Sequence, residues 1–216
     1  MMKNILFDMD GTLFDTSPGI LTCMDYVLKY YNITKFSLDD LRLCIGPPLS
    51  WTFEELFGLP KDMVDDAIKV YRQKYNGGEI FNVTPIEGME ECLKFLHENG
   101  YFISVCSSKP EVACRKILEK YHLISYFDDV CGAIPEEGIE SKEDVLELFF
   151  SRHTDANPKE TLLVGDTKYD AAGAKEFKVN FLGVNYGFGT EEELRAFGAE
   201  HIVSSAREVL EFIEKC

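Results

Sequence analysis

Positive charge is scarce in this chain of 216 residues, where 22 Lys and Arg stand against 38 Asp and Glu and the formal net charge is −16. Nucleic acids and anionic membrane surfaces are bound by clustered Lys and Arg, so this balance argues against both as partners. Long apolar runs are also missing, and no basic segment precedes the first apolar stretch. We therefore expect neither a membrane span nor a signal peptide.

Paired cysteines are lacking as well. The seven cysteines are odd in number and include no Cys-x-x-Cys pair, which fits a reducing compartment better than a disulfide framework and predicts a cytoplasmic protein. Metal-ligand spacing is absent among the four histidines. We expect all four to be surface or structural residues: His97, His122, His153 and His201.

Strand-like and helical patterns alternate over most of the chain. Capped or amphipathic segments separate the apolar runs, and such alternation requires crossover connections between parallel strands. The pattern predicts an α/β fold with a Rossmann-like three-layer α/β/α core built on a parallel sheet. The strands are expected over residues 4–7, 102–106, 129–131, 161–164 and 179–183, and the helices over 88–99, 111–121, 142–152 and 171–176.

Residues 16–84 break this alternation because their patterns are helical only. Ser17-Pro18 is typical of a helix start, and three further helices are expected over 38–44, 49–57 and 62–75. We therefore predict a core domain of residues 1–15 and 85–216 and an all-helical domain of residues 16–84 inserted after the first strand. Its own small core is expected to contain Tyr26, Tyr30, Trp51, Phe53 and Phe57.

Polar residues stand where three of the predicted strands end. Asp8 and Asp10 follow the first strand, Ser107 follows the second and Asp166 follows the fourth. Ligands of open parallel sheets bind beyond the carboxyl ends of the strands. We expect these residues, far apart in the sequence, to face one crevice.

The stretch Asp8-Met9-Asp10-Gly11-Thr12 resembles the first motif of the haloacid dehalogenase superfamily in its phosphatase form, Asp-x-Asp-Gly-Thr. Ser107 matches the hydroxyl residue of the second motif, and Lys142 matches the lysine of the third. Residues 165–170 match the fourth, Gly-Asp-x-x-x-Asp. Two departures are that Ser107 stands where threonine is commoner and that glutamate, not proline, follows Lys142. The second departure leaves other candidates for the third-motif lysine, since Lys116, Lys120 and Lys168 also stand near plausible strand ends or helices.

This resemblance implies phosphoryl transfer through an aspartyl-phosphate. Asp8 would be the nucleophile, and Asp10 the acid that protonates the leaving oxygen and then the base that activates water. Thr12 and Ser107 would donate hydrogen bonds to the phosphoryl oxygens, and Lys142 would neutralise charge on them and on Asp8.

Charge counting at these positions calls for a metal ion. Asp8, Asp10, Asp166 and Asp170 against Lys142 leave an excess of negative charge before a phosphate arrives, and Mg²⁺ suits such oxygen ligands. By resemblance, Asp8 and Asp166 would bind Mg²⁺ through their side chains and Asp10 through its backbone carbonyl. Asp170 would act through a water or as a partner of Lys142. From the residues alone, Asp166 could also be a helix N-cap.

By the same resemblance the helical insertion is a type-1 cap, and its loop at residues 45–49 is similar to that of phosphoglycolate phosphatases. Candidates for substrate specificity are Arg42, Gly46, Pro47 and Lys109. The sequence thus predicts a Mg²⁺-dependent phosphatase that hydrolyses a small phosphorylated metabolite and is a monomer or a homodimer.

Several other functions remain open from the sequence. A phosphomutase of the β-phosphoglucomutase type has the same motifs and cap, and a nucleotidase or pyrophosphatase would have the same fold. Asp10 argues against a dehalogenase, which does not need that residue. A receiver-like signalling module would place its acidic pair and its phosphoacceptor on different strands. A catalytically silent protein of this fold is the remaining alternative.

Overall fold

The computed structural model describes residues 2–216, apart from the side chains of residues 38, 39 and 42. The chain divides into two compact units, one formed by Met1–Asp15 with Pro85–Cys216 and the other by Thr16–Thr84. We call them the core unit and the helical unit. Within the described residues, no helix has both the length and the apolar character that crossing a membrane requires.

The core unit is built on a six-stranded sheet in the order β5-β4-β1-β6-β7-β8, and every neighbouring pair is parallel. The central strand β1 has an apolar sequence because both of its faces are covered, as is usual in parallel sheets. The predicted α/β fold with a parallel sheet is confirmed. The strands are β1 (Asn4–Phe7), β4 (Phe102–Pro110), β5 (Asp129–Ala133), β6 (Thr161–Gly165), β7 (Asn180–Val184) and β8 (His201–Val203).

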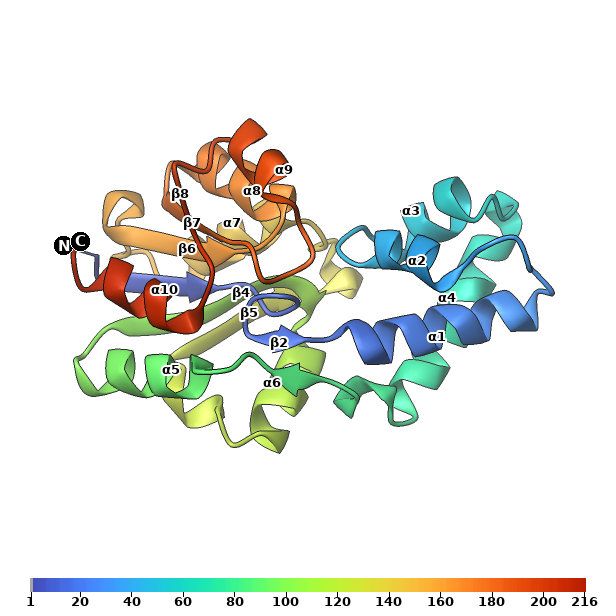
Figure 1. Ribbon diagram of the computed structural model, residues 1–216, viewed down its shortest axis with the longest axis horizontal. Coiled ribbons are helices and arrows are strands. Elements are labelled where there is room, and N and C mark those ends of the chain that lie inside the picture. Colours follow the sequence, from blue (N-terminus) through green and yellow to red (C-terminus); the bar gives the residue numbers. More distant parts are fainter. Residues whose placement is uncertain (1) are drawn as a thin grey trace. The chain divides into compact units, whose positions relative to one another are not determined.

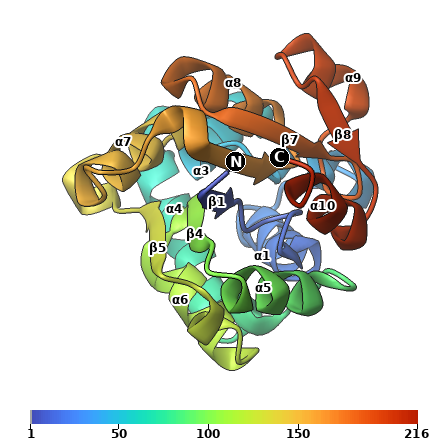
Figure 2. The same ribbon diagram turned by 90° about the vertical axis from the view of Figure 1, so that its left-hand side faces the viewer.

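Helices cover both faces of this sheet. In Figure 2, α7 and α8 lie on one side of the strands, and α5, α6 and α10 lie on the other. One part of the buried core is formed where α7 and α8 pack on the strands, through residues that include Leu6, Phe149 and Leu163. The helices are α5 (Met89–Glu98), α6 (Glu111–Lys120), α7 (Lys142–Arg152), α8 (Lys168–Phe177), α9 (Glu191–Ala196) and α10 (Ala206–Ile213).

Two element boundaries in the core unit differ from the prediction by three residues or more. Strand β4 continues through the polar residues Ser107, Ser108 and Lys109 to Pro110, with an irregularity in its pairing to β5 between Ser107 and Pro110. Helix α8 begins at Lys168, three residues earlier than expected, and its N-cap is Thr167. The interpretation of Asp166 as an N-cap is therefore wrong.

The helical unit contains α1 (Ser17–Tyr30), α2 (Leu38–Leu41), α3 (Leu49–Trp51) and α4 (Lys61–Asn76). Pro18 lies in the first turn of α1, where its missing N–H leaves no helical hydrogen bond unmade. The predicted helix over 49–57 is divided, since a π-helical turn at Thr52–Leu56 follows α3. Two short strands at the limits of the unit, β2 (Phe14–Asp15) and β3 (Thr84–Pro85), form a separate two-stranded sheet. Figure 1 traces these elements along the chain.

The aromatic core predicted for the helical unit is only partly correct. Phe53 and Phe57 are buried and their rings lie 5.9 Å apart. Tyr26, Tyr30 and Trp51 are 44%, 57% and 47% exposed, so their assignment to the core is wrong.

Candidate active site

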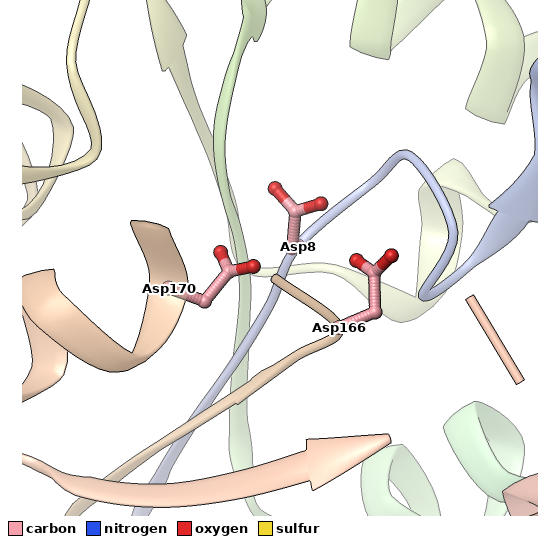
Figure 3. A group of neighbouring side chains, drawn as sticks. All are labelled: Asp8, Asp166 and Asp170. Carbon is pink, nitrogen blue, oxygen red and sulfur yellow. The ribbon is translucent and has the colours of Figure 1, made fainter. Parts of the chain in front are cut away.

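Three buried carboxylates meet at the carboxyl ends of two central strands. Asp8 follows β1, Asp166 follows β6, and Asp170 lies in the first turn of α8. One carboxylate oxygen of each lies within 4.8 Å of the others. Figure 3 shows the three side chains side by side, although 162 residues separate the first from the last (170 − 8). The parallel sheet therefore brings together aspartates that are far apart in the sequence, as expected from the strand ends.

Lys142, the first residue of α7, is the cation among these carboxylates. Its Nζ donates to Asp8 Oδ1 and to the backbone oxygen of Cys106, each at 2.6 Å, and it forms an ion pair with Asp170 Oδ1 at 2.7 Å. Ser141 caps α7 and forms a reciprocal capping box with Asp144, which fixes the start of the helix and with it the position of Lys142. The ammonium is buried, so its attraction to the two carboxylates is weakly screened.

Asp166 receives hydrogen bonds from two segments. Thr12 Oγ1 donates to Asp166 Oδ1 at 3.1 Å, and the Phe188 amide donates to Asp166 Oδ2 at 2.7 Å. Gly11 allows the turn after β1 to lie against this carboxylate. It has φ +79°, and a Cβ there would lie 2.2 Å from Asp166 Oδ2, so the turn admits no side chain. The Thr12 hydroxyl thus donates to a carboxylate in this structure. To donate to a phosphate, as predicted, it would have to give up its hydrogen bond to Asp166.

Asp10 is held by a different lysine. Lys109 Nζ lies 2.8 Å from Asp10 Oδ1 and 3.2 Å from Oδ2, and the Lys109 side chain is only 5% exposed. Lys109 reaches Asp10 because β4 pairs with β1 and continues past it. Ser107 is buried on the same strand, and its Oγ accepts a hydrogen bond from the Lys109 amide at 3.3 Å. Lys109, predicted as a specificity residue, is in this structure a partner of Asp10.

Burial dominates the electrostatics of the site. It raises the pKa of Asp8 to about 6, although the Lys142 ammonium opposes this change. Burial and the nearby Asp170 and Asp8 raise the pKa of Asp166 well above its usual range. Burial also disfavours the charged form of Lys142, but Asp170 and Asp8 outweigh it and raise its pKa. Three close carboxylates with a single ammonium among them are therefore not fully neutralised by the chain.

This donor set fits a divalent cation. The groups are carboxylate oxygens, which Mg²⁺ prefers, and all three side chains belong to the core unit. A cation would offset the burial and the carboxylate repulsion that raise the pKa values of Asp8 and Asp166. Both Asp170 oxygens already have partners, Lys142 on one and the amide and hydroxyl of Thr167 on the other.

The remaining candidates lie elsewhere. Lys116 and Lys120 are exposed, and Lys168 pairs with Glu193 at 3.1 Å, so Lys142 is the lysine that contacts Asp8. The side chain of Arg42 lies outside the described residues. Gly46, with φ +105°, and Pro47 form a turn in the helical unit. None of the four histidines belongs to the carboxylate group found among the described residues, and His153 instead pairs with Asp129 at 2.9 Å.

Sequence reasoning missed the segment that follows β7. Residues 185–189 read Asn-Tyr-Gly-Phe-Gly, and they supply the Phe188 amide to Asp166. The two glycines flanking Phe188 were the available signal, since glycine allows the backbone to approach another group closely.

The fold and this group of residues define a phosphatase of the haloacid dehalogenase type, and comparison with known proteins agrees. The family model described as haloacid dehalogenase-like hydrolase matches residues 5–184. The chain belongs to this family, and it is an enzyme of its phosphatase branch.

Proteins similar to this chain are named after different substrates. The chain is 31% identical to a 5'-nucleotidase of Pseudomonas aeruginosa, over 96% of this chain and 95% of that one. It is 27% identical to a phosphoglycolate phosphatase of Vibrio parahaemolyticus, over 98% and 96%. A crystal structure of a predicted phosphatase from Clostridium acetobutylicum is 32% identical, covers 100% of both chains and superposes with a TM-score of 0.94.

Proposed function

We propose that this protein is a Mg²⁺-dependent phosphatase that hydrolyses small phosphate monoesters through an aspartyl-phosphate on Asp8. The observation that supports this most directly is the placement of Asp8. It is buried at the end of β1, with Lys142 Nζ 2.6 Å from one of its oxygens and with Asp10 two residues away. A carboxylate oriented by a fixed ammonium is suited to attack phosphorus.

In the first half-reaction, an Asp8 oxygen forms a bond to phosphorus while the bond from phosphorus to the ester oxygen breaks. Asp10 gives its proton to that departing oxygen. In the second, water attacks phosphorus, Asp10 takes a proton from the water, and the bond between Asp8 and phosphorus breaks to release phosphate. Lys142 stabilises the negative charge on Asp8 and on the phosphoryl oxygens throughout. Lys109 orients Asp10, since its Nζ contacts both carboxylate oxygens.

Asp8 and Asp166 would hold Mg²⁺ through their side chains and Asp10 through its backbone carbonyl, with Asp170 acting through a water or through Lys142. When bound, Mg²⁺ supplies positive charge that offsets the carboxylates and the phosphate. Ser107 would donate a hydrogen bond to the phosphoryl group, and its burial on β4 beside Lys109 supports that role.

For the substrate, we propose a small phosphorylated metabolite of the phosphoglycolate class, selected by the helical unit acting as a cap. The loop at residues 45–49 and the sequence Ser108-Lys109-Pro110 support this choice. A nucleoside 5'-monophosphate is the second candidate, because the relative at 31% identity is named a 5'-nucleotidase.

The test is phosphate release from a panel of esters: phosphoglycolate, nucleoside 5'-monophosphates, hexose phosphates and pyrophosphate. Release with Mg²⁺ should be lost with EDTA and in Asp8→Asn, and it should persist in Asp155→Asn, which alters an exposed aspartate. The ranking of the esters identifies the substrate class. Interconversion of hexose phosphates without release would indicate a phosphomutase, and release that survives Asp8→Asn would refute the proposed nucleophile.

A further inference from the structure

The loop after β7, residues 185–189, touches both strand ends that carry the buried carboxylates. It begins one residue beyond the stretch matched by the family model, which ends at residue 184. We call it the β7 loop. Its residues are half-buried, except for the exposed Asn185.

The β7 loop fixes one side of the Asp166 carboxylate. The Phe188 amide donates to Oδ2 at 2.7 Å, while Thr12 donates to Oδ1 at 3.1 Å from the opposite segment. Hydrogen bonds to both oxygens leave the carboxylate one orientation.

Close approach of this loop depends on its two glycines. A Cβ on Gly187 would lie 2.3 Å from Asp166 Oδ2, and a Cβ on Gly189 would lie 2.1 Å from the backbone oxygen of Asp166. Neither glycine has a positive φ, so alanine would meet a clash with Asp166 and no backbone strain. Residues 187 and 189 therefore need to be glycine because there is no room for a side chain beside Asp166.

The same loop reaches the turn after β1. Tyr186 Oη donates to the backbone oxygen of Thr12 at 3.3 Å. The Phe188 ring packs on Gly11, since a Cβ there would lie 2.8 Å from Phe188 Cδ2. The loop therefore connects the segment of Asp166 to the segment of Asp8 and Asp10.

From these contacts, we infer that the β7 loop is a positioning element that holds the Asp166 carboxylate against the β1 turn, in place to bind Mg²⁺. The inference rests on the proposed metal role of Asp166. Groups that orient metal ligands contribute about 10- to 100-fold to metal affinity in known sites. The loop touches neither substrate nor metal in this role, so it acts through Asp166.

The test measures Mg²⁺ binding by isothermal titration calorimetry with MgCl₂ alone, without substrate. Gly187→Ala should raise the Kd for Mg²⁺ about tenfold or more, because its Cβ displaces either the loop or the carboxylate. Gly183→Ala is the matched control. It lies in β7, where it pairs with Gly165, and its Cβ would meet the Ile202 and Leu194 side chains at 3.1 and 3.2 Å rather than Asp166. We expect its Kd to stay within about twofold of wild type, as it leaves these partners intact.

Thermal unfolding of both variants separates positioning from general destabilisation. A folded Gly187→Ala protein that binds Mg²⁺ with the wild-type Kd would overturn the inference. If that variant does not fold, Phe188→Ala decides the question, since it keeps the amide but removes the ring from Gly11. A several-fold rise in Kd is expected, and an unchanged Kd would overturn the inference. Absence of Mg²⁺ binding by the wild-type protein would instead refute the proposed metal role, and this inference with it.

Discussion

Two groups of charged residues in the core unit use their charges in opposite ways. The carboxylate site, formed by Asp8, Asp10, Lys109, Lys142, Asp166 and Asp170, has four acids and two cations. The edge cluster, around the outer strand β5, has two acids, two arginines and a histidine: Glu111, Arg115, Asp129, Arg152 and His153. The acids and arginines of the edge cluster balance one another, whereas the carboxylate site keeps an excess of negative charge.

The edge cluster has a structural role that its contacts explain. Arg115 and Arg152 each donate to the backbone oxygen of Val130 at 3.3 Å, which covers part of the open edge of β5. Burial alone would raise the pKa of Asp129, but hydrogen bonds from His153, the Val130 amide and Cys131, together with Arg152, outweigh it and lower the pKa. In the carboxylate site the pKa values of Asp8 and Asp166 move upward instead.

The difference indicates which group serves function. A cluster that lowers the pKa of its acid stabilises the folded chain without any ligand, whereas one that raises the pKa of its acids is improved by an added cation. Helix α7 links the two groups, because its first residue is Lys142 and its last is Arg152. One helix therefore supplies a cation to each.

The largest effect is expected from Lys142→Met. Removing the ammonium leaves the buried Asp8 and Asp170 without a positive partner, so we expect phosphate release to fall by about a thousandfold. The free energy of unfolding should fall by about 3–5 kcal/mol. Urea unfolding and steady-state kinetics measure both. Lys116→Met, at an exposed position of α6, is the control and should change neither. If Lys142→Met turned over substrate at the wild-type rate, the carboxylate site could no longer be distinguished from the edge cluster as the functional group.

Asp129→Asn should have a smaller effect, confined to stability. The substitution weakens the hydrogen bonds from His153 and the Val130 amide, which corresponds to about 1–3 kcal/mol of unfolding free energy. Turnover should remain within about twofold of wild type, because the hydrogen bonds and ion pairs of Asp129 with the described residues do not include the carboxylate site. A more than twofold fall in turnover, measured where the variant is still folded, would show that the edge cluster takes part in catalysis.

The smallest expected effect is that the difference in unfolding free energy between wild type and Asp129→Asn depends on pH. Because folding lowers the pKa of Asp129, its contribution is present above its unfolded pKa of about 3.9 and is lost as the pH falls through the lower folded value. The difference in unfolding free energy between wild type and Asp129→Asn should thus be constant near neutral pH and shrink in acid. Urea unfolding at a series of pH values measures it, and a difference that grows in acid would mean that the pKa of Asp129 is raised.

The central features of the fold and site were predictable because they depend on local patterns. Apolar runs marked β1, β6 and β7 to within one or two residues, and parallel pairing then required Asp8 and Asp166 to meet. Strand β4 was predicted to end at Cys106, since the polar residues that continue it have no strand-like pattern.

Other features depend on contacts between distant residues. Thr12 and Asp166 are 154 residues apart, and the Lys109–Asp10 pair spans 99. No sequence pattern encodes which of several hydroxyls or lysines makes such a contact. The exposure of Trp51 also escaped prediction, because helical spacing identifies a shared face but does not say what covers it.

The most direct test of the account is to identify the phosphorylated residue. Wild-type protein is mixed with the best ester of the panel and Mg²⁺, quenched in acid within the first turnover, digested and examined by mass spectrometry. The account predicts a phosphoryl group on the peptide that contains Asp8, located at Asp8 by fragmentation and absent from Asp8→Asn. A phosphoryl group on another residue, or rapid phosphate release with Asp8 unmodified at every quench time, would contradict it.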